Sequence, residues 1–415
     1  MVRKIVSRSE FTKNVLTLLT GTTLAQAIPF AISPILTRLF SPEDFGVFFV
    51  FSSIVAIGSI IVTAKYELAV LLPEKDEDAI NIVAIALLIT MVVSLFTLLG
   101  ILFFREEIQE LLNDTTEGLW LYLVPLSLFL VGLFQSFNYW HTRKKKFKIM
   151  AVSKVCQAGT TGTSNLFIGL SSGNGFGLIC STIIGQFVAV LILITRFIKH
   201  DGKLCVYINT SNIKSQAVRY KAFPGLMVFG NMFNISAFQL PNILLSSILG
   251  TGFIGLYALS QRVIKTPLTI ISTSFGDVFK QRAAELVAGN NSCRGLFVKS
   301  ITTLALFSLP FFTVFYLYAP SLFAFTFGEE WREAGEYAKV LAPYFWLGFV
   351  VGPMTHIFYI LEYQRTYALI QSALLMAILL VVFSGTINSI EIVTMLSLSY
   401  SSIYILMAFV LWKIT

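Results

Sequence analysis

The stretch VCQAGTTGTSNLFIGLSSGNGFGLICSTIIGQFVAVLILIT, residues 155–195, lies between Lys154 and Arg196 and contains no charged residue. A helix crosses the roughly 30 Å hydrocarbon core of a bilayer with about 20 apolar residues, so this stretch is too long for one span. The run SSGNGFG at 171–177 is a turn signal inside it. The stretch therefore predicts two membrane helices joined by a tight turn.

Composition extends this pattern to the whole chain. The chain has 415 residues, of which 56% are hydrophobic and 13% are charged, and its mean hydropathy is +0.78. Backbone groups in lipid must be satisfied internally, which leaves helices and closed barrels. The apolar runs are too long and too uniform for barrel strands, which are about ten residues long and alternate in polarity. The predicted fold class is an all-α polytopic membrane protein.

Apolar runs recur from Val15 to Trp412 and predict about twelve transmembrane helices. The run 222–261 is divided by the turn signal Gly250-Thr251-Gly252. The links are too short to hold a soluble domain. The expected helices span 14–39, 44–72, 79–104, 118–140, 151–171, 175–196, 222–248, 253–275, 297–318, 336–358, 366–387 and 391–412.

Charged residues alternate between the links. The links around 143–148, 196–221 and 280–299 are basic, whereas those around 106–117 and 329–336 are acidic. Lys and Arg mark cytoplasmic loops of membrane proteins. Both termini are therefore predicted in the cytoplasm, and the net charge of +8 indicates this bias rather than a nucleic-acid partner.

A weak internal repeat suggests how the helices are grouped. The segment ILTRLFSPEDFGVFFV at 35–50 aligns with LLSSILGTGFIGLYAL at 244–259, although chance similarity of apolar segments is the alternative. Repeats related by an axis along the membrane normal recur in transporters. We expect two six-helix bundles around a central cavity: an N-terminal bundle at 1–200, a cytoplasmic linker at 201–221 and a C-terminal bundle at 222–415.

Two cations lie deep in an expected helix. Arg262 is about ten residues past Gly252, or about 15 Å along the helix, and Lys265 follows on the same face. Charges at membrane depth are costly and mark functional sites. We expect both to bind an anionic substrate. The alternative is that Lys265 extends to the membrane edge and Arg262 pairs with a backbone carbonyl.

Three more charged residues are candidates. Lys65 and Glu67 lie near the cytoplasmic end of the expected helix 44–72. Because they are two residues apart on a helix, we expect them on roughly opposite sides, where they do not neutralise each other. Arg38 ends the first helix and is a candidate substrate-binding residue, with a local ion pair to Glu43 or Asp44 as the alternative.

Uncharged polar residues and small residues add further candidates. Asn231 and Asn234 give the helix 222–248 a polar content suited to lining a cavity or to hydrogen bonding between helices. Gly348 and Gly352 form a GxxxG pattern, which is typical of close helix packing.

No pattern indicates catalysis. The chain carries no HExxH motif and no glycine-rich phosphate loop. Its four cysteines are scattered without metal-ligand spacing. We therefore expect no catalytic residue, no metal and no cofactor. Transport would draw on an ion gradient, and Glu67, the acid within a span, is the candidate site for a coupling cation, H⁺ or Na⁺.

Two segments carry a family resemblance. These are ILTRLFSPEDFGVFFVFSSIVAI at 35–57 and KYELAVLLPEKDEDA at 65–79. They resemble the patterns TRxLGPEDFG and RYExAIxLP of Wzx-type O-antigen and polysaccharide flippases, in the multidrug/oligosaccharidyl-lipid/polysaccharide exporter superfamily. Lys65 stands where the family has arginine, which keeps the charge and loses the bidentate fork.

The resemblance implies a function. It implies alternating access that moves an undecaprenyl-pyrophosphate-linked oligosaccharide from the cytoplasmic to the periplasmic leaflet of a bacterial inner membrane. The implied partners are this lipid-linked oligosaccharide, membrane lipids, a coupling cation and glycan-assembly proteins. The substrate-binding candidates are then Arg262, Lys265, Lys65, Arg38, Asn231 and Asn234.

Other functions remain as alternatives. A small-molecule or drug exporter of the same superfamily would favour acids within the spans, whereas this chain has more bases there. A membrane glycan polymerase or ligase would carry a large periplasmic loop, which the short links do not provide. A structural scaffold would have little reason to bury Arg262.

Overall fold

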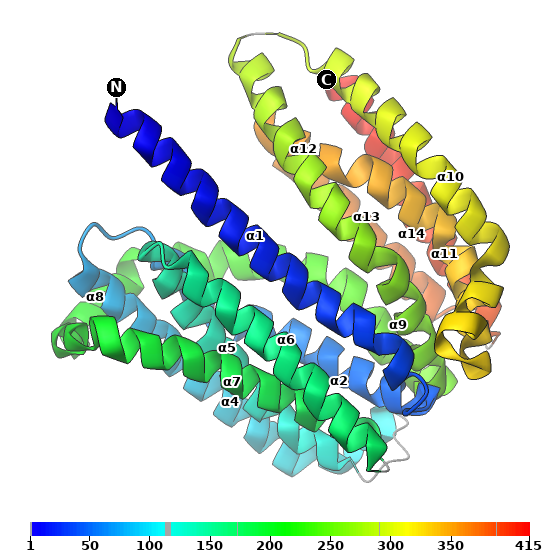
Figure 1. Cartoon of the computed structure of the whole chain (residues 1–415), viewed down its shortest axis with the longest axis horizontal. Coiled ribbons are helices and arrows are strands. Elements are labelled where there is room, and N and C mark those ends of the chain that lie inside the picture. The colour runs from blue at the N-terminus through cyan, green and yellow to red at the C-terminus, as the bar shows by residue number, and fades with distance from the viewer. Residues whose placement is uncertain (1, 113–117, 172, 290, 387) are drawn as a thin grey trace. The chain divides into compact units, whose positions relative to one another are not determined.

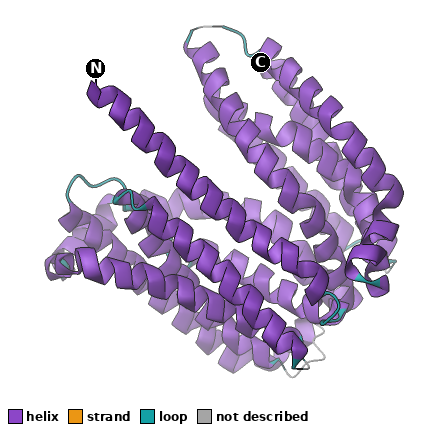
Figure 2. Cartoon of the chain, viewed as in Figure 1, coloured by secondary structure: helices purple, strands orange, loops and turns teal. Residues whose placement is uncertain are grey.

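The computed structural model describes residues 2–112, 118–171, 173–289, 291–386 and 388–415. Within these residues the chain forms helices joined by loops and turns, and it holds no strand (Figure 2). It divides into two compact units, Met1–Ile235 and Ser236–Thr415 (Figure 1). The boundary lies inside one long helical segment, beyond the predicted linker 201–221, and the predicted limits of the two bundles stay a prediction.

Among the described residues, the first unit contains six long helices and several short ones. Its elements are α1 (Val2–Leu36), α2 (Pro42–Ile61), α3 (Tyr66–Ala69), α4 (Asp76–Leu112), η1 (Leu119–Tyr122), α5 (Leu123–Arg143), α6 (Phe147–Leu170), α7 (Gly175–Asp201), η2 (Gly202–Tyr207), α8 (Thr210–Arg219), the π turn η3 (Phe223–Met227) and the beginning of α9 (Val228–Ala288).

The charge-free stretch forms two helices, as predicted. α6 ends at Leu170 and α7 begins at Gly175. The side chain of Asn174 caps α7 by accepting a hydrogen bond from the N–H of Gly177. The carboxylate of Asp44, at the start of α2, accepts one from the N–H of Gly175 at 2.6 Å. The turn between α6 and α7 is thereby tied to the turn before α2.

The prediction of one continuous helix over 44–72 is wrong. α2 ends at Ile61, and α3 begins only at Tyr66. Ala64 and Lys65 between them have φ values of +47° and +61°. Left-handed backbone at two consecutive residues interrupts the helical hydrogen-bond ladder, so the chain changes direction before Glu67.

Glycine brings α1 and α6 close together. A Cβ at Gly21 would lie 2.4 Å from the Cβ of Ala151, and a Cβ at Gly162 would lie 2.6 Å from Ile32. Small residues at these positions allow the helix backbones to approach, as is typical of membrane helix pairs.

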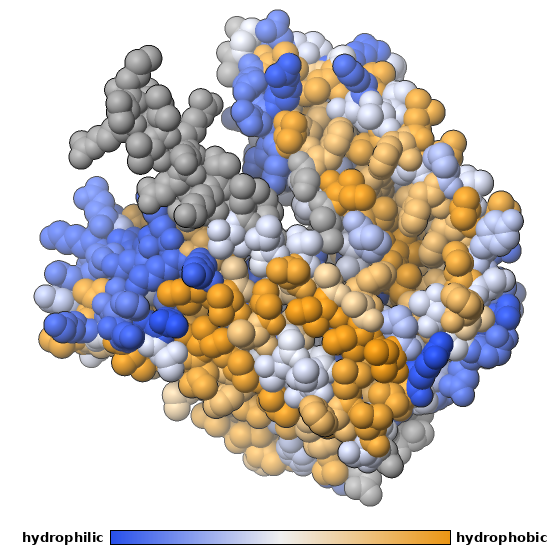
Figure 3. Space-filling view, viewed as in Figure 1, coloured by the Kyte–Doolittle hydropathy of each residue, from blue (hydrophilic) through white to orange (hydrophobic). Residues whose placement is uncertain are grey.

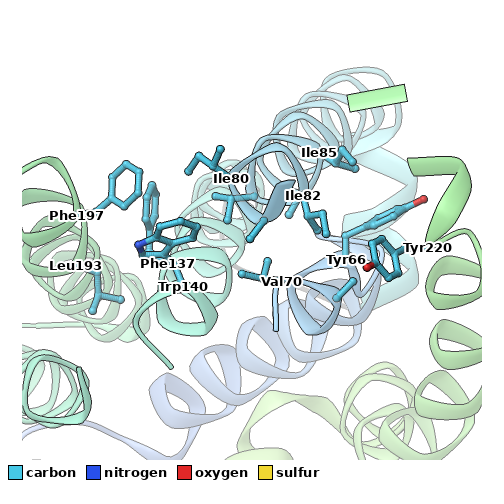
Figure 4. Close-up of a cluster of buried hydrophobic side chains, with 14 residues drawn as sticks. Tyr66, Val70, Ile80, Ile82, Ile85, Phe137, Trp140, Leu193, Phe197 and Tyr220 are labelled. Carbon is cyan, nitrogen blue, oxygen red and sulfur yellow. The ribbon is translucent and has the colours of Figure 1, made fainter. Parts of the chain in front are cut away.

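A buried apolar cluster holds α3, α4, α5 and α7 together (Figure 4). Trp140 is fully buried in it, and its ring packs edge-on against Phe197 at 5.5 Å between centroids. Tyr66 joins the cluster and donates a hydrogen bond to the carbonyl of Ala217, at 3.0 Å. Thus α8, within the predicted linker, is anchored beside the break that follows α2.

The second unit begins within α9 and continues through five helices and two short turns. These are α10 (Arg294–Phe327), η4 (Glu329–Trp331), α11 (Arg332–Val351), η5 (Gly352–Thr355), α12 (His356–Ile360), α13 (Gln364–Val382) and α14 (Ser389–Ile414).

α9 folds back on itself at Gly250, as the turn signal predicts. Gly250 has φ +83° and ψ +168°, a conformation that glycine adopts readily. The ammonium of Lys265 lies 5.4 Å from the ring centroid of Phe238. A straight helix would separate these two residues by about 40 Å. The two halves of α9 are therefore two neighbouring helices.

The number of long helices confirms the predicted fold class. Nine helical segments among the described residues are long and apolar enough to cross a membrane. One of them, Ile235–Val287, contains the turn at Gly250, and α1 and α6 are long but more polar. Counted with these, the described residues form twelve long helices.

Surface polarity of the first unit follows the membrane pattern. Hydrophilic side chains gather over the end where α7 finishes and α8 lies, and hydrophobic side chains cover the middle of the helices (Figure 3). The predicted cytoplasmic links at 143–148 and 196–221 are at this polar end. The orientation of the termini stays a prediction.

Candidate functional site

Glu67 is a buried acid in the first unit, with only 2% of its surface exposed. The hydroxyl of Thr63 donates a hydrogen bond to its Oε2 atom. The Nζ atom of Lys65 lies 3.7 Å from its Oε1 atom. The expectation that Lys65 and Glu67 do not neutralise each other is wrong, because Lys65 is left-handed and not part of a regular helix.

A glutamine from α5 completes a polar cluster around this acid. Gln135 Oε1 lies 3.4 Å from the hydroxyl oxygen of Thr63, and Gln135 Nε2 donates to the carbonyl of Ser59 at 3.4 Å. We call Thr63, Lys65, Glu67 and Gln135 the Glu67 cluster. It places carboxylate, hydroxyl and amide oxygens together in a buried setting, which is an arrangement able to exchange a proton or a small cation.

Backbone strain lies next to the cluster. Residues other than glycine with left-handed backbone cost about 1–2 kcal/mol each, and Ala64 and Lys65 both have it. Such strain persists where surrounding contacts hold it, and it gathers at functional sites. Here the ion pair of Lys65 with Glu67 is one contact that holds it.

An ionic network braces the link after α3. Arg143 Nε lies 2.8 Å from Asp76 Oδ1 and Lys146 Nζ lies 3.0 Å from Asp201 Oδ2. Lys144 contacts both acids. Arg143 also donates to the carbonyls of Val70 and Pro73. The basic link at 143–148 therefore fixes α4, α5 and α7 to one another beside the Glu67 cluster.

Arg38 is exposed just beyond the end of α1. The alternative of an ion pair with Asp44 is not realised, since the Asp44 carboxylate accepts hydrogen bonds from the N–H of Ser41 at 3.0 Å and the N–H of Gly175. Within the described ranges Arg38 has no ion-pair partner. Its role in binding stays a prediction.

Arg262 and Lys265 lie in the second half of α9, one turn apart. Arg262 is partly exposed and Lys265 is exposed. In the part of the chain that the structure describes, neither has an ion-pair partner. Thr266 and Thr269 donate to the backbone carbonyls of these two residues, at 2.7 and 2.8 Å. The two cationic groups are therefore not neutralised by an acid among the described residues, and the ammonium of Lys265 lies over the Phe238 ring.

The two asparagine candidates lie apart from these cations in sequence. Asn231 is exposed near the start of α9, within the first unit. The side chain of Asn234 lies outside the described residues. Their role in lining a cavity stays a prediction.

Sequence reasoning missed Lys154 in α6. Its Nζ atom lies 3.5 Å from the hydroxyl of Thr22 in α1. Because α6 begins at Phe147, and not at 151 as expected, Lys154 lies about 10 Å into the helix. The only signal in the sequence was a lysine bordering the charge-free stretch.

Sequence reasoning also missed a cavity of about 160 Å³ in the second unit. It lies among α9, α11 and α14, and Lys265, Thr269, Ser272, Tyr344, Gly348 and Tyr404 are among the residues that line it. A Cβ at Gly348 would lie 3.3 Å from the Tyr404 ring, whereas one at Gly352 would meet nothing within 4 Å. The GxxxG pattern is therefore not a close helix contact at both glycines.

Comparisons with known proteins agree with this fold. The lipid II flippase MurJ in an inward closed conformation has a TM-score of 0.76 at 12% identity, over 96% of this chain and 87% of that one. An inward-facing multidrug resistance transporter of the MATE family has a TM-score of 0.62 at 11% identity, over 96% and 94%. A transporter of the MOP superfamily from Pyrococcus furiosus has a TM-score of 0.60 at 11% identity, over 97% of this chain and 95% of that one.

Comparison by sequence identifies a family. No curated protein matches the chain in sequence. One family model matches residues 35–336, which is more than half of the chain and includes both motif segments, the Glu67 cluster and both cations of α9. The chain therefore belongs to the family described as polysaccharide biosynthesis proteins.

Proposed function

We propose that the protein is a flippase for an undecaprenyl-pyrophosphate-linked oligosaccharide, such as an O-antigen repeat unit. It moves this lipid from the cytoplasmic to the periplasmic leaflet of a bacterial inner membrane by alternating access, with both termini in the cytoplasm. Membership of a polysaccharide biosynthesis family and a transporter fold shared with a lipid II flippase support a lipid-linked glycan as substrate. The protein is not expected to be an enzyme.

The single observation that carries the proposal is the pair Arg262 and Lys265. A charge at membrane depth is costly unless a partner compensates it. These two cations share a helix face and lack an acidic partner among the described residues. A diphosphate carries several negative charges, and guanidinium binds phosphate oxygens with two parallel hydrogen bonds. An anionic headgroup is thus the ligand that their chemistry fits best.

The Glu67 cluster is the proposed coupling site. Protonation of Glu67 would remove the negative charge that holds Lys65 at 3.7 Å. Lys65 would then be free to bind the anionic substrate, so proton uptake and substrate binding would be linked. Na⁺ is the other candidate, because carboxylate, hydroxyl and amide oxygens are suitable ligands for a hard cation.

The remaining candidates have supporting roles in this proposal. Arg38, exposed beyond the end of α1, would attract the anionic headgroup, and Asn231 and Asn234 would offer hydrogen bonds to the glycan. Glycan-assembly proteins and membrane lipids are the expected partners besides the substrate.

A small-molecule exporter is the second candidate, because MATE transporters share the fold. An exporter of cationic drugs needs an acid that is available to its ligand. Glu67 is instead buried and paired with Lys65. This pairing favours the flippase over the drug exporter.

Arg262→Ala tests the proposal in cells that depend on this protein for surface glycan. We expect surface glycan to be lost and the lipid-linked precursor to accumulate in the cytoplasmic leaflet. Arg282→Ala is the matched control, since Arg282 is an exposed arginine near the end of the same helix. Normal surface glycan with Arg262→Ala, at equal protein level in the membrane, would refute an anion-binding role for this residue.

A further inference from the structure

The cavity in the second unit combines an aromatic wall with a polar wall. Tyr344 and Phe345 of α11 lie 4.5 Å apart between ring centroids, and Tyr344 lies 6.0 Å from Tyr404 of α14. On the other side, α9 contributes Lys265 and, at helical spacing, Thr269 and Ser272. Small-molecule sites are typically apolar and aromatic surfaces with a few placed polar groups.

An aromatic row holds these side chains in place. Tyr400 stacks on Phe238 at 5.8 Å and on Tyr344 at 4.5 Å between ring centroids. The Tyr400 hydroxyl donates to the carbonyl of Ala237 at 3.3 Å. Because the Lys265 ammonium lies over Phe238, the same row positions both the cation and the aromatic wall.

The size of the cavity suits a small part of a ligand. Its volume of about 160 Å³ is below the range of drug-sized pockets. Because the cavity is partly open, it can hold one ring of a larger molecule or a compound of similar size.

The chemistry of the walls narrows the choice further. The faces of a sugar ring are apolar C–H groups that pack on aromatic rings, and its edge carries hydroxyls. The Thr269 hydroxyl donates to the Lys265 carbonyl, so its oxygen is left to accept from a sugar hydroxyl. A lipid chain would leave these polar groups without partners, and a cationic compound would be repelled by Lys265.

We propose that this cavity is a subsite for a glycosyl phosphate, with the sugar ring against Tyr344 and Tyr404 and the phosphate at Lys265. The proposal rests on the flippase function and deepens it. In an undecaprenyl-pyrophosphate-linked glycan, one sugar is attached directly to the diphosphate. The cavity would read this first sugar, so it would set which glycans the protein accepts.

Binding to the purified full-length protein in nanodiscs tests the subsite. The probes are glucose 1-phosphate, glucose, inorganic phosphate and a short-chain prenyl diphosphate glucose. We expect glucose 1-phosphate to bind about tenfold more tightly than glucose or phosphate alone, and the prenyl-linked probe to bind more tightly still. Equal affinity of glucose 1-phosphate and phosphate would overturn the proposal. A prenyl-linked probe no tighter than glucose 1-phosphate would overturn the lipid-linked source.

A matched pair of variants locates the binding. Gly348→Leu places a side chain in the cavity, whereas Gly352→Leu places it in open space. We expect the first to weaken glucose 1-phosphate binding about tenfold or more and the second to leave it unchanged. Lys265→Gln keeps a polar side chain but removes the charge, and it should reduce the affinity for glucose 1-phosphate to that for glucose.

The outcomes separate this proposal from the proposed function. If glucose 1-phosphate binds equally to Gly348→Leu, Gly352→Leu and Lys265→Gln, the subsite is refuted, while loss of surface glycan in Arg262→Ala would still support a flippase. If the cavity variants alter binding but Arg262→Ala leaves surface glycan intact, the cavity still binds a glycosyl phosphate, while the proposed anion-binding role of Arg262 falls.

Discussion

The charged groups of the two candidate sites, one in each unit, are arranged in opposite ways. In the first unit, Glu67 is paired with Lys65, and Asp76 and Asp201 are paired with the basic link at 143–148. In the second unit, Arg262 and Lys265 have no acidic partner within the described ranges. Paired charges stabilise a conformation, whereas an unpaired cation at membrane depth is left for a ligand.

In the proposed function, the two units divide two tasks. The Glu67 cluster is buried and paired, which suits a group that changes its protonation. The cations of α9 lack acidic partners among the described residues, which suits a group that binds and releases an anion. The proposed ion-coupled transport needs both properties, and the residues proposed for them lie in different units.

The largest effect on stability is expected when the ion pair between Lys65 and Glu67 is broken. Lys65→Ala leaves Glu67 buried without a counter-charge, and removing one partner of a buried ion pair costs about 3–5 kcal/mol. We expect a marked fall in the temperature of unfolding of the purified protein. The double variant Lys65→Ala/Glu67→Leu should recover part of this loss, since it leaves no buried charge. No recovery would show that the side chain of Lys65 matters for packing and not for charge.

A smaller effect on stability is expected from the ionic network that joins Asp76 to Arg143 and Lys144. Asp76→Ala removes the partner of Arg143 and Lys144, but the Asp76 side chain is 37% exposed, so water compensates part of the loss. We expect a destabilisation of about 1 kcal/mol, measured by thermal unfolding, and a weaker effect at high salt. A loss as large as that of Lys65→Ala would mean that the network, and not the Glu67 cluster, is the main electrostatic support of this unit.

The smallest effect on stability is expected in the second unit. Lys265→Gln removes a cation that has no ion-pair partner among the described residues but lies over the Phe238 ring, so the free energy of unfolding should change by only about 0.5 kcal/mol. The same variant should lose affinity for glucose 1-phosphate. If it unfolds as readily as Lys65→Ala, Lys265 serves the structure, and the contrast between the two units fails.

The sequence predicted most of the helices because their signal is local. The turns at 171–177 and at Gly250 were visible as glycine-rich interruptions of long apolar runs, and both are present. The break after α2 was not visible, because Ala64 and Lys65 are not residues that favour left-handed backbone. Only contacts made after folding, such as that of Lys65 with Glu67, compensate such a conformation.

The candidate residues are easier to single out from the sequence than their surroundings. Arg262, Lys265 and Glu67 were found because a charge in an apolar run is conspicuous in any membrane sequence. The Lys265 cavity was missed because Tyr344 and Tyr404 lie on helices far apart in the chain. Aromatic residues are common in the apolar helices of this protein, so no single one of them indicates a binding site.

The sequence by itself determined that this chain is a bundle of membrane helices with cations at depth, because hydrophobicity and charge are properties of each residue and its near neighbours. Only the tertiary structure decided which charges are paired and which aromatic rings form a cavity with Lys265. Those outcomes depend on distances between segments that are remote in sequence, and a fold sets these distances through the packing of the whole unit.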